Sequence, residues 1–406
     1  MKALAVALMI GIAAGCSGAP DAPPPTAADL SAVAWPEVEA AARGTTVRFA
    51  MWAGDEARNR FYEDAVTRDL ATRLGITLEI VPLGDTADLV NKLLTEREAG
   101  RHTGSVDMVW INGENFRTAR QGGLLWGPFA ERLPNIHYYD ADARDRDFGT
   151  PTDGFEAPWQ HGQFVFAYDT ARVADPPRSL EALRAWIIAH PGRFTYPAPP
   201  DFTGSAFVRH VLYLAGGASP AAFQDGFDDA LYARTSSRAL AWLRDVRPYL
   251  WRSGKTYPAT PAELDRLFVN GEVDFSMSYG PTFASERIAR GEFPPTARTF
   301  VLDAGTVFNY SFLAIPFNAP NPGGAMAVIN DWLSPAHALA RARALGGIVP
   351  IPPDRLTPAE RAAVDALPIG PATLPVATLA AHRLPEGDAA YLVRLERDWF
   401  LEVLRR

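Results

Sequence analysis

Apolar runs and amphipathic stretches alternate along the first part of the folded chain, in an order that predicts strand, helix, strand, helix, strand. Three short apolar runs are typical of buried strands: residues 47–51, 77–81 and 106–111. Residues 56–74 have apolar side chains at helical spacing and stop at Gly75, and a second helix is predicted between Asp85 and Gly100. This order indicates a parallel sheet covered by helices on both faces.

Polarity changes abruptly where the third apolar run ends. Ile111 is followed at once by Asn112, Glu114 and Asn115, and Gly113 allows a tight turn. These polar groups lie where a strand hands over to a helix, which is the edge of an α/β sheet where ligands are usually held. We therefore predict that all three contact a ligand. The alternative is helix capping, because an Asn at the N-cap and an acidic first turn satisfy free backbone N–H groups.

The later part of the chain predicts a second α/β unit. Residues 157–169 end in an apolar strand, and residues 194–196 are predicted to form the first strand of the second unit. Residues 201–205 open the next helix, with backbone N–H groups expected to point outward. A further strand is expected at 273–278, an extended segment at 300–316, and a mostly helical tail after it.

The composition is that of a globular chain with enough residues for two domains. Of its 406 residues, 48% are apolar and 21% are charged, which excludes a disordered chain. The net charge of −8 argues against nucleic acid, because proteins that bind it usually carry a basic face. It does not restrict the choice of a small ligand.

The N-terminus resembles an export signal. Lys2 precedes an apolar run at 3–14, which is too short to span a bilayer, and small residues lead to Cys16. This ending resembles the lipobox of bacterial lipoproteins and implies cleavage and lipidation at Cys16. A plain secretory signal is the alternative, and either one implies export. Since Cys16 is the only cysteine, no internal disulfide is expected.

Residues 17–43 are rich in Ala and Pro and are predicted to be an extended tether that holds the folded part off a membrane surface. The fold is expected to begin near Gly44.

Six segments resemble a known family in order and spacing: residues 105–116, 122–129, 133–135, 157–169, 271–280 and 308–316. The chain resembles the extracellular solute-binding proteins of ABC importers, the two-lobe periplasmic-binding-protein type II group that includes sugar, polyamine, iron and thiamine binders. The resemblance covers nearly everything from Val47 onward. It implies two doubly wound α/β lobes joined by crossover hinge strands, with the chain divided as follows: signal peptide 1–16, tether 17–43, lobe 1 at 44–160, lobe 2 at 161–300, return crossover and completion of lobe 1 at 301–335, and C-terminal helices, mainly of lobe 2, at 336–406.

The resemblance also implies a function. A small polar solute is captured between the lobes and delivered to a membrane permease, while a separate ATPase subunit supplies the energy. The solute stabilises the closed form through its higher affinity for that state. A monomer is expected, with no cofactor, no metal and no chemistry of its own. The alternatives are a secreted carbohydrate- or ester-active hydrolase, and a surface adhesion or sensor domain.

Polar groups from the strand ends of both lobes, together with aromatic rings, are expected to surround the solute. Ten residues are predicted to bind it: Trp52, Asn112, Glu114, Asn115, Trp159, Gln160, Ser205, Tyr279, Asn309 and Tyr310. For each tryptophan the alternative is packing in a core. Aromatic rings with amides suit a sugar, whereas aromatic rings with Glu114 and Asp55 suit an organic cation, which we favour slightly.

Enzyme signatures are weak. The chain has no G-x-S-x-G elbow, and residues 254–256 resemble the end of a P-loop whose earlier glycine is replaced by Tyr249. The seven histidines are scattered without the spacing of a zinc site. Carboxylates are abundant enough that a glycosidase stays an alternative.

Overall fold

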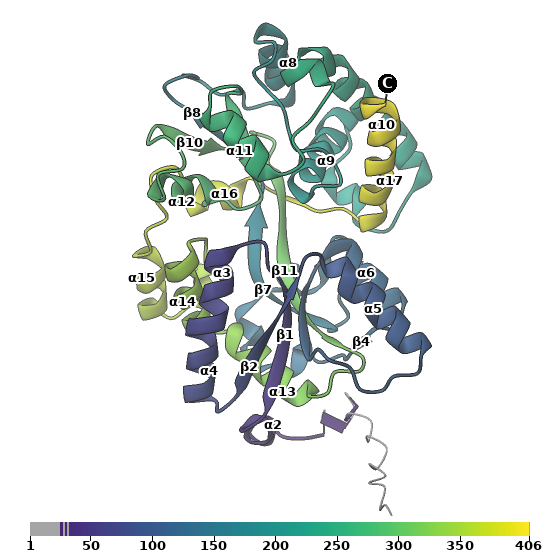
Figure 1. Cartoon of the computed structure of the whole chain (residues 1–406), viewed down its shortest axis with the longest axis vertical. Coiled ribbons are helices and arrows are strands. Elements are labelled where there is room, and N and C mark those ends of the chain that lie inside the picture. The colour runs from purple at the N-terminus through teal and green to yellow at the C-terminus, as the bar shows by residue number, and fades with distance from the viewer. Residues whose placement is uncertain (1–24, 27–28, 31, 406) are drawn as a thin grey trace, which may run out of the picture.

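The computed structural model describes residues 25–26, 29–30 and 32–405. Two lobes lie one above the other, and two strands, β7 (Glu156–Gln163) and β11 (Thr306–Pro316), run between them (Figure 1). The predicted signal peptide and Cys16 lie outside the described residues. No helix in the described part of the chain is both long and apolar enough to cross a bilayer.

Lobe 1 is built on a sheet whose first three strands are parallel, as predicted. These are β1 (Thr46–Trp52), β2 (Thr77–Leu83) and β3 (Met108–Ile111), with β1 between the other two. The return strand β11 adds to β3 in the antiparallel sense, and β12 (Arg383–Pro385) completes the edge. The mixed sheet agrees with the fold class that the sequence predicted.

Helices cover both faces of this sheet. The predicted helix at 56–74 is one continuous element in three parts: α3 (Glu56–Arg60), a π-helical turn (Phe61–Val66) and α4 (Thr67–Arg73). Three more helices pack around the sheet: α5 (Thr86–Glu98), α6 (Gly113–Gln121) and α13 (Pro322–Trp332). The predicted cap of α5 is confirmed, since the Asp85 carboxylate accepts a hydrogen bond from the N–H of Ala87.

The end of the predicted tether is folded, which corrects the boundary at residue 43. Residues Trp35–Ala42 form helix α2, which buries Val38 and Ala42 and packs against α13. Upstream of it, Arg132 donates to the carbonyl of Leu30. The Ala-rich composition that suggested a tether is equally favourable to a helix once an apolar stripe has a surface to cover.

Lobe 2 contains a three-stranded antiparallel sheet in the order β10 (Ala297–Phe300), β8 (Val165–Asp169), β9 (Phe275–Ser278). Its main helices are α8 (Leu180–Ala189), α9 (Phe202–Gly216), α10 (Asp229–Val246), α11 (Pro261–Val269) and α12 (Phe283–Ala289). The predicted strand at 194–196 is wrong: Phe194 and Tyr196 are buried, but they pair with no strand. Their rings fill the core against Phe207 of α9, so their apolar character reflects packing and not sheet pairing.

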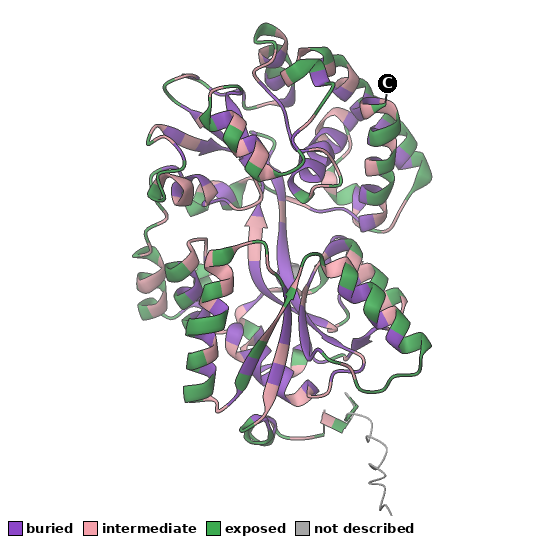
Figure 2. Cartoon of the chain, viewed as in Figure 1, coloured by how far each residue is buried: buried purple, intermediate pink, exposed green. Residues whose placement is uncertain are grey.

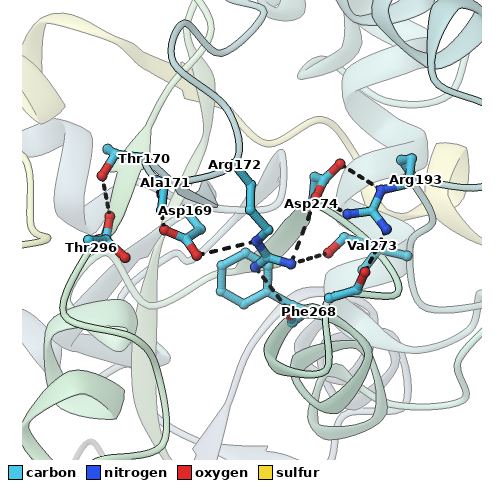
Figure 3. A network of polar contacts seen from close by, with 10 residues as sticks. Asp169, Thr170, Ala171, Arg172, Arg193, Phe268, Val273, Asp274 and Thr296 are labelled. Carbon is cyan, nitrogen blue, oxygen red and sulfur yellow. Dashed lines mark hydrogen bonds and ion pairs between the residues drawn. The ribbon is translucent and has the colours of Figure 1, made fainter.

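A polar network ties the end of β8 to the turn between α11 and β9 (Figure 3). Arg172 donates to Asp169, 3.2 Å from Nε to Oδ2, and to the carbonyls of Val273 and Phe268. Arg193 Nε donates to Asp274 at 2.8 Å. Each arginine thus bridges segments that are distant in sequence, and the network stabilises lobe 2 itself.

The C-terminal region is divided between the lobes, whereas the predicted boundary placed residues 336–406 mainly in lobe 2. Helices α14 (Pro335–Leu345) and α15 (Pro358–Asp365) pack on the lobe 1 core. After α16 (Val376–Ala381), helix α17 (Ala389–Trp399) buries Tyr391, Leu395 and Trp399 in lobe 2. Strand β11, which runs between the two lobes, is buried along nearly its whole length (Figure 2).

Candidate functional site between the lobes

The carboxyl ends of the lobe 1 strands face lobe 2, and the two lobes touch there. Helix α6, which follows β3, packs against α17 of lobe 2 (Figure 1). A short hairpin of lobe 1, made by β5 (Arg146–Asp147) and β6 (Thr150–Pro151), also contacts lobe 2. Its Arg146 forms an ion pair with Asp225 at 3.0 Å and donates to the carbonyl of Gln224. We call residues 146–151 the cross-lobe hairpin.

Backbone geometry shows how closely the cross-lobe hairpin approaches lobe 2. Phe148 has φ +43°, and Gly149 has φ +74°, a conformation that favours glycine. A Cβ atom on Gly149 would lie 2.8 Å from both the backbone of Asp388 and the carbonyl oxygen of Gln224. Glycine is therefore required here both for its φ angle and for the close contact between lobes.

Asp147 of the cross-lobe hairpin contributes a buried carboxylate to the junction. Its Oδ2 accepts a hydrogen bond from the N–H of Gly113, 2.6 Å away, at the start of α6. Its Oδ1 has no partner, although the residue is only 1% exposed. Burial raises the pKa of Asp147 well above its usual range, and the nearby charges of Glu114 and Glu386 raise it further.

Glu156, at the start of β7, is the second buried carboxylate. It is 1% exposed, and neither of its oxygens has a hydrogen-bond partner. Burial raises the pKa of Glu156 well above its usual range, and the neighbouring Asp147 adds to the increase. Both acids are therefore stabilised in the neutral form, since a buried charge without a counter-charge is costly.

Lobe 2 contributes an ion pair to the same region. Arg209 of α9 binds Glu386 through two hydrogen bonds of 2.8 Å, and both side chains are almost fully buried. The Tyr279 hydroxyl donates to Glu386 at 2.6 Å, while Nη1 of Arg209 has no partner. The guanidinium lies 5.5 Å from the ring centre of Phe148, which belongs to lobe 1. We call Asp147, Glu156, Arg209, Tyr279 and Glu386 the carboxylate junction.

Four predicted site residues lie around the carboxylate junction. Asn112 is half-buried at the N-cap of α6, and its side chain makes no capping hydrogen bond. The Asp147 carboxylate accepts a hydrogen bond from the N–H of Gly113, the first residue of this helix. Glu114 is exposed in the first turn of α6 and acts electrostatically on Asp147. Ser205 is buried and donates to Glu396 of α17. Together with Tyr279, these residues come from both lobes, as predicted for a shared site.

The predicted row of outward N–H groups at 201–205 is wrong. The Asp201 side chain accepts hydrogen bonds from the N–H groups of Thr203 and Gly204, so the first turn of α9 is capped from within the chain. Burial raises the pKa of Asp201, whereas these two backbone hydrogen bonds lower it. An Asp directly before the helix was the sequence signal for such a cap.

Trp159 lies in the core of lobe 1, as the alternative interpretation proposed. It is 1% exposed and packs against the rings of Phe49, Tyr62 and Trp332, with centroid distances of 6.1, 5.8 and 5.4 Å. Its position on β7 suggested the ligand site, but alternation along that strand turns this side chain toward the lobe 1 helices. The structure therefore does not place it with the junction residues.

The other predicted residues are dispersed. Trp52 is 42% exposed at the end of β1, and Asn115 is half-buried in α6. Asn309 and Tyr310 lie nearly buried on β11, and Tyr310 packs against Tyr139. The Gln160 side chain accepts a hydrogen bond from Arg341 of α14. These five stay predictions as ligand contacts.

Sequence reasoning missed Asp147, Arg209 and Glu386, which dominate the electrostatics of the junction. Arg209 had a visible signal, because it is a lone cation in an otherwise apolar helix that is buried nearly throughout. Asp147 had none, since it lies in a loop-rich segment full of other charges. No group of three or more His, Cys, Asp or Glu within the described ranges is arranged to hold a metal ion.

Comparisons with known proteins agree on the class of protein. The sequence profile of the bacterial extracellular solute-binding protein family matches residues 65–368. Protein YnjB of Escherichia coli K12 is 38% identical over 369 residues, which cover 90% of this chain and 92% of YnjB. The fold is similar to that of PotD, a spermidine/putrescine ABC-transporter substrate-binding protein from Streptococcus pneumoniae. The TM-score is 0.61 at 16% identity, and the match covers 88% of this chain and 98% of PotD. The fold is also similar to that of the Tp0655 (TpPotD) lipoprotein of Treponema pallidum, with a TM-score of 0.62 at 15% identity, covering 89% of this chain and 100% of that chain.

Proposed function

Because the chain belongs to the family of bacterial extracellular solute-binding proteins, we propose that it is the substrate-binding component of an ABC importer and captures a small organic cation between its two lobes. The family works outside the cytoplasm, and structural neighbours of the chain are substrate-binding proteins of ABC transporters. The observation that carries the choice of a cation is the presence, in the carboxylate junction, of two buried acids, Asp147 and Glu156, that form no ion pair with any described residue.

The charge balance of the junction is simple. Arg209 and Glu386 neutralise each other in a buried pair, whereas Asp147 and Glu156 form no ion pair within the described residues. Arg120 lowers the pKa of Glu156 electrostatically, but its own ion pair is with Asp153. Exposed Glu114 and the half-buried Glu396 lie nearby and act electrostatically on the junction. A bound cation offsets the cost of ionising buried acids, so it binds more favourably here than a neutral sugar of the same size. Binding should therefore release protons.

Groups from both lobes meet at the junction, which links binding to closure. Asp147 and Glu114 belong to lobe 1, whereas Arg209 and Glu386 belong to lobe 2. A solute that contacts both sets binds the closed arrangement more tightly than an open one and so shifts the equilibrium toward it. PotD, with the same fold, is named for spermidine and putrescine, so the fold is compatible with organic cations.

The remaining parts of the proposal concern partners. The closed form delivers its solute to a membrane permease that works with an ATPase subunit, and the protein acts as a monomer. Lipidation at Cys16 anchors it to a membrane, and the Treponema neighbour of the same fold is a lipoprotein. The comparisons give the hydrolase alternative no support.

A thermal-shift screen of the purified protein tests the solute class. The screen compares polyamines, thiamine-like cations, sugars, amino acids, phosphonates and metal ions. A cation at about a hundredfold over its Kd should add roughly 2.7 kcal/mol to the free energy of unfolding. The bound compound should be recovered unchanged. A shift confined to sugars would contradict the cation, and turnover of the compound would favour the hydrolase.

Two variants test whether the solute binds at the carboxylate junction. Asp147→Asn keeps an oxygen that can accept from the Gly113 N–H but removes the negative charge, so we expect Kd for the cation to rise at least tenfold. Asp274→Asn is the matched control, since it removes a carboxylate from the lobe 2 network in Figure 3. That control should lower stability and leave Kd unchanged. Equal Kd values for both variants would place the solute elsewhere.

A further inference from the structure

Arg341 is a buried cation with no acidic partner. It lies on α14, is 7% exposed, and donates through Nη1 to the side-chain oxygen of Gln160 at 2.9 Å. Its Nε has no hydrogen-bond partner, and no Asp or Glu within the described residues forms an ion pair with it. Arg209, by contrast, is also buried but has Glu386 as a counter-charge. Burying an unpaired charge costs several kcal/mol, so Arg341 demands an explanation.

The polar groups around Arg341 include hydrogen-bond donors that, like its own Nε, lack a partner. Four buried side chains from the π-helical turn, the loop before α7 (Ala141–Arg144), β7 and α13 have a polar atom without a partner: Tyr62 OH, Tyr139 OH, Trp159 Nε1 and Trp332 Nε1. All four of these atoms can donate a hydrogen bond. The ring of Tyr62 lies 5.8 Å from that of Trp159 and 5.1 Å from that of Trp332, and Tyr62 and Tyr139 both interact electrostatically with Arg341. We call Arg341 and these four residues the arginine cluster.

The titratable neighbours do not supply the missing negative charge. Arg341 interacts electrostatically with Tyr62, Arg58 and Tyr139, and none of these three is a carboxylate. Burial raises the pKa of Tyr62 and of Tyr139, so both hydroxyls stay protonated. Arg58 adds a second cation, positioned 4.9 Å from the ring centre of Trp110.

The two neighbouring histidines are neutral. Burial and the charge of Arg341 lower the pKa of His337 to about 3. Burial also lowers the pKa of His161 to about 3, with Arg383 and Arg341 adding to the effect. The region is thus rich in donors. Asp69 acts electrostatically on His337 and Glu286 on Arg58, but no acid in the described part of the chain forms an ion pair with Arg341.

We propose that the arginine cluster is a binding site for a small oxyanion, such as a carboxylate, sulfate or phosphate group. An oxyanion supplies negative charge to Arg341 and offers several lone pairs to the Tyr and Trp donors. Guanidinium is the side chain best suited to such a partner, because its N–H groups match the spacing of oxyanion oxygens. The site lies in lobe 1 and differs in charge from the carboxylate junction, so it does not depend on the proposed organic cation.

The test measures thermal unfolding of the whole protein in acetate, sulfate or phosphate against chloride at matched ionic strength. Sulfate and phosphate stabilise many proteins without saturation, so the expected result is a saturable increase in Tm above that background. In Arg341→Met the saturable increase should disappear. Its Tm in chloride should equal or exceed that of the parent, because replacing an unpaired buried charge by an apolar side chain is neutral or stabilising.

Controls separate a site from a structural arginine. Arg172→Met breaks the network of Figure 3 and should lower Tm in chloride while the oxyanion response stays intact. If Arg341→Met does not fold, Tyr62→Phe with Tyr139→Phe tests the same site, with an expected increase in Kd of about tenfold or more. The proposal would be overturned if acetate, sulfate and phosphate raised the Tm of the parent protein no more than chloride does. It would also be overturned if the increase in Tm were the same in the Arg341 and tyrosine variants as in the parent.

One further arm identifies the source of the oxyanion. If the oxyanion is a group of the transported solute, saturating acetate should raise the Kd of that solute by competition. If it is a free inorganic ion, the two ligands should bind together and their effects on Tm should add. Either result keeps the site, and the Arg341→Met variant decides whether the site exists.

Discussion

The carboxylate junction and the arginine cluster are both buried polar groups, yet they are built in opposite ways. The junction assembles residues of two lobes and contains an internal ion pair, Arg209 with Glu386, beside two buried acids that form no ion pair in the part of the chain that the structure describes. The arginine cluster lies within lobe 1 and holds a cation that lacks an acid. In each region a buried ionisable group without an ion-pair partner indicates the ligand, because a charge in a protein interior is costly unless an opposite charge offsets it. The comparison therefore predicts a cation between the lobes and an oxyanion inside one of them.

The internal pair of the junction should give the largest effect on stability. Glu386→Gln leaves Arg209 buried without a counter-charge, and we expect a loss of about 3–5 kcal/mol in the free energy of unfolding. Denaturant unfolding measures it. The exposed pair Arg184–Asp245 is the control, and Arg184→Ala should cost less than about 1 kcal/mol. Equal losses would mean that the junction pair contributes no more than a surface pair.

Contact between the lobes can be tested at one glycine. Gly149→Ala should destabilise the closed arrangement by about 2 kcal/mol, from a strained φ angle and a clash with Asp388. Gly192 has φ +83° with nothing within 4 Å of a Cβ atom, so Gly192→Ala has only the strain of the φ angle. Unfolding in denaturant gives both values, and the difference between them isolates the cross-lobe contact. No difference would show that the hairpin does not press on lobe 2.

Stability against pH distinguishes two acids, Asp147 of lobe 1 and Asp169 of lobe 2, by the sign of their contribution. Burial raises the folded-state pKa of Asp147, so its contribution is full below the unfolded pKa and is lost as pH rises through the raised value. Asp147→Asn should therefore gain Tm relative to the parent as pH increases from about 4. Calorimetry at several pH values measures the difference.

Asp169 provides the opposite case. Burial raises its pKa, but hydrogen bonds and the Arg172 guanidinium outweigh burial and lower the pKa overall. Its contribution is present above the unfolded pKa and is lost as pH falls through the lower folded pKa. Asp169→Asn should thus lose Tm relative to the parent as pH rises. If both variants responded in the same direction, the assignment of Asp147 as a buried neutral acid would be wrong.

The smallest expected effect concerns the exposed acid at the junction. Glu114→Gln should raise the Kd of an organic cation by about threefold to tenfold, since exposed charges are screened by solvent. Calorimetric titration measures it, and the effect should shrink at high salt. Glu98→Gln, an exposed acid at the far end of α5, should leave Kd unchanged.

The sequence by itself determined the fold class and the edge where lobe 1 meets its partner. Periodicity located β1, β2 and β3, and the carboxyl ends of parallel strands meet at one edge. Asn112 and Glu114 therefore lie at the start of α6, which packs against α17 of lobe 2, and their role as ligand contacts stays a prediction. These features depend on spacing within short stretches, which the chain displays directly.

Only the tertiary structure decided the electrostatics. Asp147 reaches Gly113 across 34 residues, and Arg209 reaches Glu386 across 177 residues, so no local pattern could pair them. Trp159 has the residue type and strand position of a ligand contact, and burial against Trp332 is what assigns it to the core. The sequence shows which residues can carry a charge. How far each one is desolvated, and which opposite charge lies beside it, depend on which distant segments pack together. Desolvation and counter-charges determine what a buried group can bind.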